Sequence, residues 1–138
     1  MKKIVIVLFL AVIFAVSLVG CGGGSGSGGS SSGSPSQYAG TWTGSWTLSD
    51  GEYGTAYITI SDSGAMSGYL RNSSNISTTG FSGQITGSAV SLSYQYSWNT
   101  SPYNCSGTVG SIVGNRFTIN FSFASGSSDT GTCTLTKQ

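Results

Sequence analysis

The feature that most constrains the fold of this chain is an alternation of apolar and polar residues with a period of two, which runs from Gly40 to the end. Successive side chains of a β-strand point to opposite faces, so this alternation is typical of strands that bury one face. In the first such segment Trp42, Gly44, Trp46 and Leu48 share one face, and the residues between them are Ser and Thr. The expected inward positions of seven further strands are Ala56, Ile58 and Ile60; Met66, Gly68 and Leu70; Phe81, Gly83 and Ile85; Val90, Leu92, Tyr94 and Tyr96; Cys105, Gly107 and Val109; Phe117, Ile119, Phe121 and Phe123; and Cys133, Leu135 and Lys137.

Three of these segments share the order buried residue, Ser, Gly, any residue, buried residue, at positions 66–70, 81–85 and 105–109. A glycine at an inward position relieves crowding and allows sharp strand curvature, and closure of a sheet removes its unpaired edges. We therefore expect an all-β domain that forms an eight-stranded antiparallel up-and-down barrel, with a β-sandwich as the alternative. An outer-membrane barrel is rejected, because it would carry apolar side chains outside and polar ones inside.

The first 20 residues have the organisation of a secretory signal. Lys2 and Lys3 precede an apolar run that ends in Leu18-Val19-Gly20-Cys21, and a basic start, an apolar middle and small residues at the end describe such signals. The last four residues resemble the lipobox of bacterial lipoproteins, in which the cysteine receives acyl chains such as palmitate and becomes the mature N-terminus. The resemblance implies that residues 1–20 are a helical signal peptide and that Cys21 is the lipid attachment site. An uncleaved transmembrane helix is the alternative, since the run approaches the ~17-residue lower limit for a span.

Residues 21–37 are the lipidated cysteine followed by a tether of almost pure Gly and Ser, which behaves as a flexible, disordered coil. A G-x-G-x-x-G match at Gly24 lacks the preceding strand and following helix of a dinucleotide site, so it is linker. Two or more acyl chains attach a protein stably to a membrane. Gly22 stands where an inner-membrane retention signal would show aspartate. The resemblance thus implies an exported protein anchored to the cell envelope, at the outer membrane if the cell is Gram-negative, with its folded domain over 38–138.

Charge and composition exclude several classes of function. Beyond the leader the ionisable basic and acidic residues give a net charge of −1, and they are Arg71, Arg116, Lys137, Asp50, Glu52, Asp62 and Asp129. Nucleic-acid binding needs more cations than this. The chain has no histidine, so it lacks the usual Ser-His and Cys-His nucleophile pairs and the commonest zinc ligand. Asp50 and Glu52 form a carboxylate pair, but we interpret them as solvated acids of the first hairpin turn. We expect no enzymatic activity, no cofactor and no metal.

Gly40-Thr41-Trp42 opens the first expected strand, and residues 64–68 open the third with the sequence Gly-Ala-Met-Ser-Gly. Both segments resemble the calycin superfamily, the lipocalins and avidins, whose first strand carries G-x-W. In that superfamily a basic residue late in the last strand packs across this tryptophan, and Lys137 matches that position. The resemblance implies a closed barrel with Lys137 over the Trp42 indole, a contact worth ~0.5–2 kcal/mol. The biotin site of avidins is not carried over, because the late strands here have no Trp and no buried Asp at matching places.

Two cysteines remain once Cys21 is lipidated, namely Cys105 and Cys133. An oxidising exported compartment favours their pairing, so we predict a disulfide between them, worth ~3–4 kcal/mol on the chain-entropy model. A simple meander places them on second-neighbour strands, ~9.5 Å apart, which is farther than a disulfide spans. The disulfide therefore requires the segment before Cys105 to fold over the intervening strand, or another strand order.

Aromatic and amide side chains gather in the segment 94–104, near one end of the expected barrel. Such groups can stack on and hydrogen-bond a small molecule or a glycan. The candidate ligand residues are Trp46, Tyr94, Tyr96, Trp98 and Tyr103. The alternative is that these rings plug the barrel end, and that the domain is a structural or protein-interaction module with a filled interior. An internal cavity lined by Trp46, Tyr94 and Tyr96 would favour ligand binding, and a packed interior would favour the structural or protein-interaction module.

Overall fold

A computed structural model describes residues 34–124 and 127–138. The predicted signal peptide, the predicted lipid attachment site Cys21 and most of the predicted Gly/Ser tether therefore lie outside the described residues. The described elements, in chain order, are a short 3-10 helix η1 (Pro35–Tyr38) and the strands β1 (Gly40–Leu48), β2 (Tyr53–Ile60), β3 (Ala65–Asn72), β4 (Gly80–Thr86), β5 (Ala89–Gln95), β6 (Tyr103–Val109), β7 (Arg116–Phe123) and β8 (Thr130–Lys137). Among the residues described, no helix is long and apolar enough to cross a bilayer.

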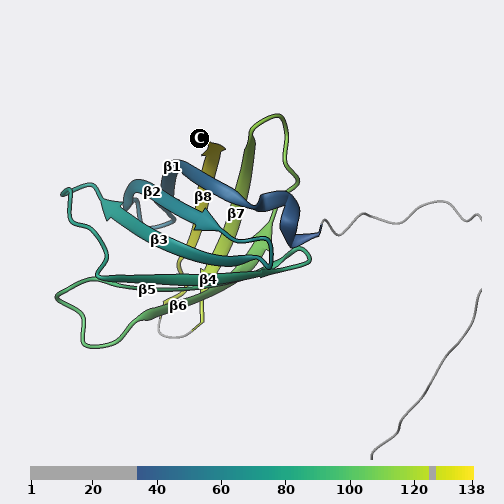
Figure 1. The fold of residues 1–138 in the computed structure, drawn as a ribbon. Helices are drawn as coiled ribbons and strands as arrows, with labels where there is room; N and C mark the ends of the chain where they lie inside the picture. The colour runs from purple at the N-terminus through teal and green to yellow at the C-terminus, as the bar shows by residue number, and fades with distance from the viewer. Residues whose placement is uncertain (1–33, 125–126) are drawn as a thin grey trace, which may run out of the picture. The chain divides into compact units, whose positions relative to one another are not determined.

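The eight strands form one closed antiparallel barrel, in which each strand pairs with the next along the chain and β8 pairs with β1 (Figure 1). The closing ladder extends from Trp42↔Lys137 to Leu48↔Gly131. The predicted up-and-down barrel is confirmed, and the β-sandwich alternative is wrong. Closure is favourable because it pairs the backbone groups of the two strands that would otherwise be edges.

Apolar side chains fill the interior of the barrel, as the alternation of the sequence predicted. The core includes Trp42 and Trp46 from β1 and inward-facing residues from each of the remaining strands, β2 to β8. No polar or charged residue of the described chain is buried there. Leu48, Phe81 and Phe123 are half-buried at its margin. Within this core the packing leaves a void of only about 10 Å³.

One end of the barrel is closed by η1 and the ring of Tyr38. The Trp42 indole Nε1 donates a hydrogen bond to the carbonyl oxygen of Tyr38 at 2.6 Å, and the Tyr38 hydroxyl donates to the carbonyl oxygen of Gly110 at 2.9 Å. The Phe117 ring lies edge-on to Trp42, with ring centroids 4.6 Å apart. We refer to this as the closed end, and Figure 1 shows η1 there, where the described chain begins.

Lys137 lies at the same end and completes the junction of first and last strands. Its Nζ is 5.4 Å from the centroid of the Trp42 ring, and the two residues are opposite each other in the β1–β8 ladder. The structure thus places Lys137 where the calycin resemblance implies it. Trp42 is fully buried and contacts η1, β7 and β8, so it joins both ends of the described chain to the wall.

Glycines at inward positions let neighbouring strands approach closely. Gly107 on β6 is paired with Phe121 on β7, and a Cβ at Gly107 would overlap the Asn120 carbonyl oxygen and lie 2.7 Å from the Phe121 Cα. Gly68 on β3 has a φ of 146°, a backbone conformation that L side chains rarely adopt. These two positions belong to the repeated Ser-Gly pattern, and they show why it recurs in a small, strongly curved barrel.

The two cysteines of the barrel are buried free thiols, so the structure corrects the predicted disulfide. Cys105 is on β6 and Cys133 on β8, and β7 lies between them, with Phe123 and Ile119 as their respective partners. Second-neighbour strands are ~9.5 Å apart, and the chain before Cys105 does not fold over β7 to shorten that distance. Burial raises the pKa of Cys105 to about 11 and that of Cys133 to about 12, which leaves both thiols protonated at neutral pH.

Gly107→Ala is expected to destabilise the barrel by ~1–3 kcal/mol, because the new methyl group overlaps the backbone of β7 and forces it aside. The measurement is the free energy of unfolding in urea. The matched control is Gly80→Ala, since a Cβ at Gly80 meets no atom within 4 Å. Equal stability of the two variants would show that the close approach of β6 and β7 is not a constraint.

Ellman's reagent is expected to find two thiols in the unreduced Cys21→Ser variant after it is unfolded in denaturant, and almost none while it is folded. The physical reason is that thiolates react and buried thiols with raised pKa values form few of them. A thiol count near zero in denaturant would show that Cys105 and Cys133 are bonded and that the strand arrangement is wrong.

Candidate functional site

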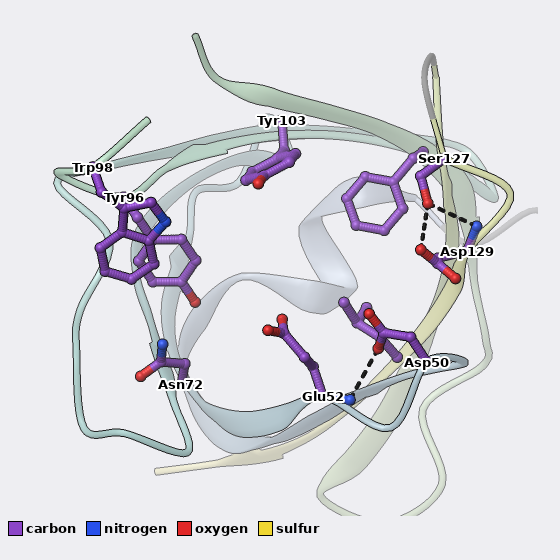
Figure 2. Close-up of a pocket in the computed structure, with 10 residues that line it drawn as sticks. Asp50, Glu52, Asn72, Tyr96, Trp98, Tyr103, Ser127 and Asp129 are labelled. Atoms are coloured by element: carbon purple, nitrogen blue, oxygen red, sulfur yellow. Dashed lines mark hydrogen bonds between the residues drawn. The ribbon is translucent and has the colours of Figure 1, made fainter. Parts of the chain in front are cut away.

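The end of the barrel opposite η1 is open and holds the candidate site. The β1–β2 turn, the end of β3, the β5–β6 loop, the end of β7 and residues 127–129 before β8 surround a pocket of about 440 Å³. We call this space the mouth pocket (Figure 2). Its lining residues are Leu48, Asp50, Glu52, Asn72, Tyr96, Trp98, Tyr103, Phe123, Ser127 and Asp129.

Aromatic side chains from the segment after β5 and the start of β6 form one side of the mouth pocket. The rings of Tyr96 and Trp98 are stacked, with centroids 4.5 Å apart and an interplanar angle of 3°. A turn holds this pair in place: the Asn99 backbone N–H donates to the Tyr96 carbonyl oxygen at 3.0 Å, and Gln95 Nε2 donates to the Asn99 carbonyl oxygen at 2.8 Å. Trp98 keeps 54% of its surface exposed, so a large aromatic face is displayed at the rim.

The hydroxyl of Tyr96 is a polar group without a partner. Tyr96 is 6% exposed, and its hydroxyl makes no hydrogen bond within the described part of the chain. Figure 2 shows this hydroxyl pointing into the pocket, towards the space that the Glu52 carboxylate also faces. Burial, and then the negative charge of Glu52, raise the pKa of Tyr96 to about 12. At neutral pH the hydroxyl therefore carries its proton and can both donate and accept a hydrogen bond.

Acidic side chains from the β1–β2 turn form the facing side. Asp50 Oδ1 accepts a hydrogen bond from the Glu52 backbone N–H at 2.9 Å, an Asx arrangement that orders the turn. The Leu48 backbone N–H donates to the Glu52 carbonyl oxygen at 2.7 Å. These bonds fix the backbone of Glu52 and leave its carboxylate directed into the mouth pocket (Figure 2).

Asp129, before β8, adds a third carboxylate and joins two parts of the rim. Ser49 Oγ donates to Asp129 Oδ1 at 3.2 Å and accepts from the Thr130 backbone N–H at 3.1 Å. Ser127 Oγ donates to Asp129 Oδ2 and accepts from the Asp129 backbone N–H. The β1–β2 turn and the β7–β8 connection are thus linked across the ladder that closes the barrel.

The structure divides the five candidate ligand residues between two places. Tyr96, Trp98 and Tyr103 line the mouth pocket, whereas Trp46 and Tyr94 line the small void in the core. Trp46 donates its indole N–H to the Thr55 carbonyl oxygen at 3.1 Å and is 4% exposed. The first ring of the aromatic segment therefore packs in the core, and the later rings line the open rim.

Sequence reasoning missed the polar half of this pocket. The sequence alone predicts solvated turn acids at Asp50 and Glu52, and it does not mark Asn72 or Asp129 as site residues. The signal that could have found them is the topology itself, because in an eight-stranded meander the turns after β1, β3, β5 and β7 all meet at one end. Three acids and the aromatic segment belong to those connections.

The pocket brings together groups that can contact a ligand in several ways. Within the described ranges no three His, Cys, Asp or Glu side chains come close enough to hold one metal ion. Stacked rings, a protonated tyrosine hydroxyl and fixed carboxylates can orient a ligand by stacking, hydrogen bonds and charge.

Comparison with known proteins defines the fold. No protein-family model matches the chain, and no curated protein matches it. A solved structure of EF1p2_mFAP2b bound to DFHBI is similar to this chain, with a TM-score of 0.61 and 16% sequence identity over 79% of this chain and 100% of that chain. At this identity the likeness shows a shared fold.

Trp46→Ala and Trp98→Ala are expected to differ sharply in stability. Trp46→Ala empties part of the core and should cost ~3–5 kcal/mol, whereas Trp98→Ala removes a half-exposed ring from one stacking contact and should cost at most ~1 kcal/mol. Urea unfolding of both variants measures the difference. A large loss of stability in Trp98→Ala would instead identify the ring as part of the plug.

Proposed function

We propose that this chain is a lipid-anchored exported protein that binds a small molecule in the mouth pocket of its barrel and catalyses no reaction. The observation that carries the proposal is the pocket itself: about 440 Å³ at the open end, with a stacked aromatic pair and a buried tyrosine hydroxyl that no described residue satisfies. A buried polar group without a partner costs free energy, and a ligand that bonds to it would recover that cost.

The order of the segments along the chain supports the proposed lipid anchor and the placement of the proposed site at the open end of the barrel. The lipobox-like Leu18-Val19-Gly20-Cys21 precedes the Gly/Ser segment, and the described residues begin with η1 at the closed end. The described chain thus starts at the closed end, and the mouth pocket opens at the other end of the barrel.

The structural likeness supports the same function at the level of the fold. EF1p2_mFAP2b, whose barrel resembles this one, binds the small molecule DFHBI. The interior of an eight-stranded barrel is either filled by side chains or holds one small ligand. In the present chain the interior is filled, so we place the ligand above the core and within the rim.

The filled interior also favours a second function. A barrel whose core void is only about 10 Å³ is a rigid body that can serve as a structural or protein-interaction module of the cell envelope. In that case the mouth aromatics would contact a protein partner, and no small molecule would bind.

A thermal-shift screen of the full chain in a non-ionic detergent, against sugars, lipids, cofactors and fragments of the cell envelope, tests the proposal. A true ligand should raise Tm saturably, with ~2.7 kcal/mol of stabilisation at a hundred-fold excess over Kd. The rise should disappear in Trp98→Ala and persist in Tyr57→Ala, which removes an exposed ring that does not line the pocket. A ligand whose shift survives Trp98→Ala binds elsewhere, and a panel without any shift favours the structural module.

A further inference from the structure

The mouth pocket has a strongly one-sided charge. Its lining includes the carboxylates of Asp50, Glu52 and Asp129 and contains neither Lys nor Arg. Two of the basic residues of the described chain lie at the closed end. There Lys137 covers the Trp42 ring, and the backbone of Arg116 forms an isolated β-bridge with Val113. These acids therefore have no cation inside the pocket to offset them.

Arg71 directly precedes the pocket residue Asn72 in the sequence, but its side chain makes its contacts outside the pocket. Its guanidinium lies over the Tyr69 ring, 5.7 Å from the centroid, and its Nε donates to Ser77 Oγ at 3.3 Å. Arg71 is exposed and does not line the pocket. Arg71 therefore does not neutralise the negative charge of the mouth pocket.

The buried hydroxyl of Tyr96 is a second and independent sign of a ligand. It is aimed into the pocket (Figure 2) and has no hydrogen-bond partner among the described residues, and it faces the same space as the Glu52 carboxylate. A group placed between them would have to donate hydrogen bonds, because a carboxylate is only an acceptor and the tyrosine oxygen can accept as well.

The spacing of the acids argues against a metal ion as that group. No set of three acidic side chains in the described chain converges on one point, whereas a cation such as Ca²⁺ needs six to eight oxygen ligands in a single shell. The carboxylates of Asp50 and Asp129 also accept hydrogen bonds from the rim itself, Asp50 from the Glu52 backbone N–H and Asp129 from Ser49 Oγ. An extended cation that meets Glu52 at one point and aromatic rings at others fits this arrangement better.

We infer that the mouth pocket binds an organic cation that carries N–H donors, an ammonium or amidinium group attached to a flat or apolar body. This inference rests on the proposed function and names the class of its ligand. The cationic group donates to the Glu52 carboxylate and to the Tyr96 oxygen, and the Asp50 and Asp129 carboxylates add attraction from the rim. The flat or apolar body of the ligand packs against the rings of Trp98 and Tyr103. The faces of these rings also attract the positive charge that the ligand carries.

Three probes of nearly one shape test the charge requirement: benzamidinium, benzamide and benzoate. Titration calorimetry of the full chain in a non-ionic detergent should show saturable binding of benzamidinium, about ten-fold tighter than that of benzamide, because the ionised donor makes charge-assisted hydrogen bonds. Benzoate should not bind, because it brings a like charge towards three carboxylates. Raising the salt concentration should weaken benzamidinium binding through screening.

Two variants test the residues, and each has a control. Glu52→Gln should weaken benzamidinium binding about ten-fold and leave benzamide binding unchanged, whereas Asp62→Asn, which removes an exposed acid from the β2–β3 turn that lies outside the pocket, should change neither. Tyr96→Phe should weaken benzamidinium binding while Tm stays the same or rises, since it deletes only a hydroxyl that has no partner in the described chain.

The outcomes separate this inference from the proposed function. Benzamidinium binding no tighter than that of benzamide, or binding that Glu52→Gln leaves intact, overturns the cationic ligand. If neutral probes then still bind and are lost in Trp98→Ala, the pocket remains a binding site for an uncharged molecule. If no probe and no compound of the thermal-shift panel binds, the proposed function fails together with the inference.

Discussion

The hydrogen-bonded pairing of β8 with β1 removes the two edges that an eight-stranded sheet would otherwise expose, and the remaining features depend on that closure. Trp42 stands at this junction, fully buried, with Lys137 opposite it and the carbonyl oxygen of Tyr38 bonded to its indole N–H. One side chain thus connects the first strand, the last strand and η1. The same contacts seal one end of the barrel and leave the other end as the place for a site.

Curvature and packing determine where in the barrel a ligand can lie. Glycines such as Gly107 let the strands approach closely, and large rings from β1 and β7 then fill the narrow interior, where the void beside Trp46 and Phe121 has a volume of only about 10 Å³. A ligand is therefore excluded from the core and must use the space above it. The rim offers that space, and it is ordered by hydrogen bonds within its turns and by the bond from Ser49 to Asp129 between two of its segments.

Most of the acidic side chains of this small barrel lie at one end, and most of the basic side chains lie at the other. The carboxylates of Asp50, Glu52 and Asp129 surround the open end, and Lys137 and Arg116 belong to the closed end. A domain with so few charges gains little stability from them, because exposed ion pairs contribute little. Their separation matters instead for which ligands approach the mouth, since a site of one sign attracts ions of the other.

The sequence by itself determined the class of fold and the inward face of each strand, because the period-two alternation and the repeated inward glycines are local properties of the chain. It also located the aromatic residues Tyr96, Trp98 and Tyr103. Only the tertiary structure decided that Cys105 and Cys133 stay apart, since β7 lies between their strands, and that the inward-facing Trp46 and Tyr94 border a small void in the core instead of a large cavity. The acidic half of the mouth pocket could not be read from the sequence, because Glu52 and Asp129 are far apart along the chain and share one rim only after β8 has closed on β1.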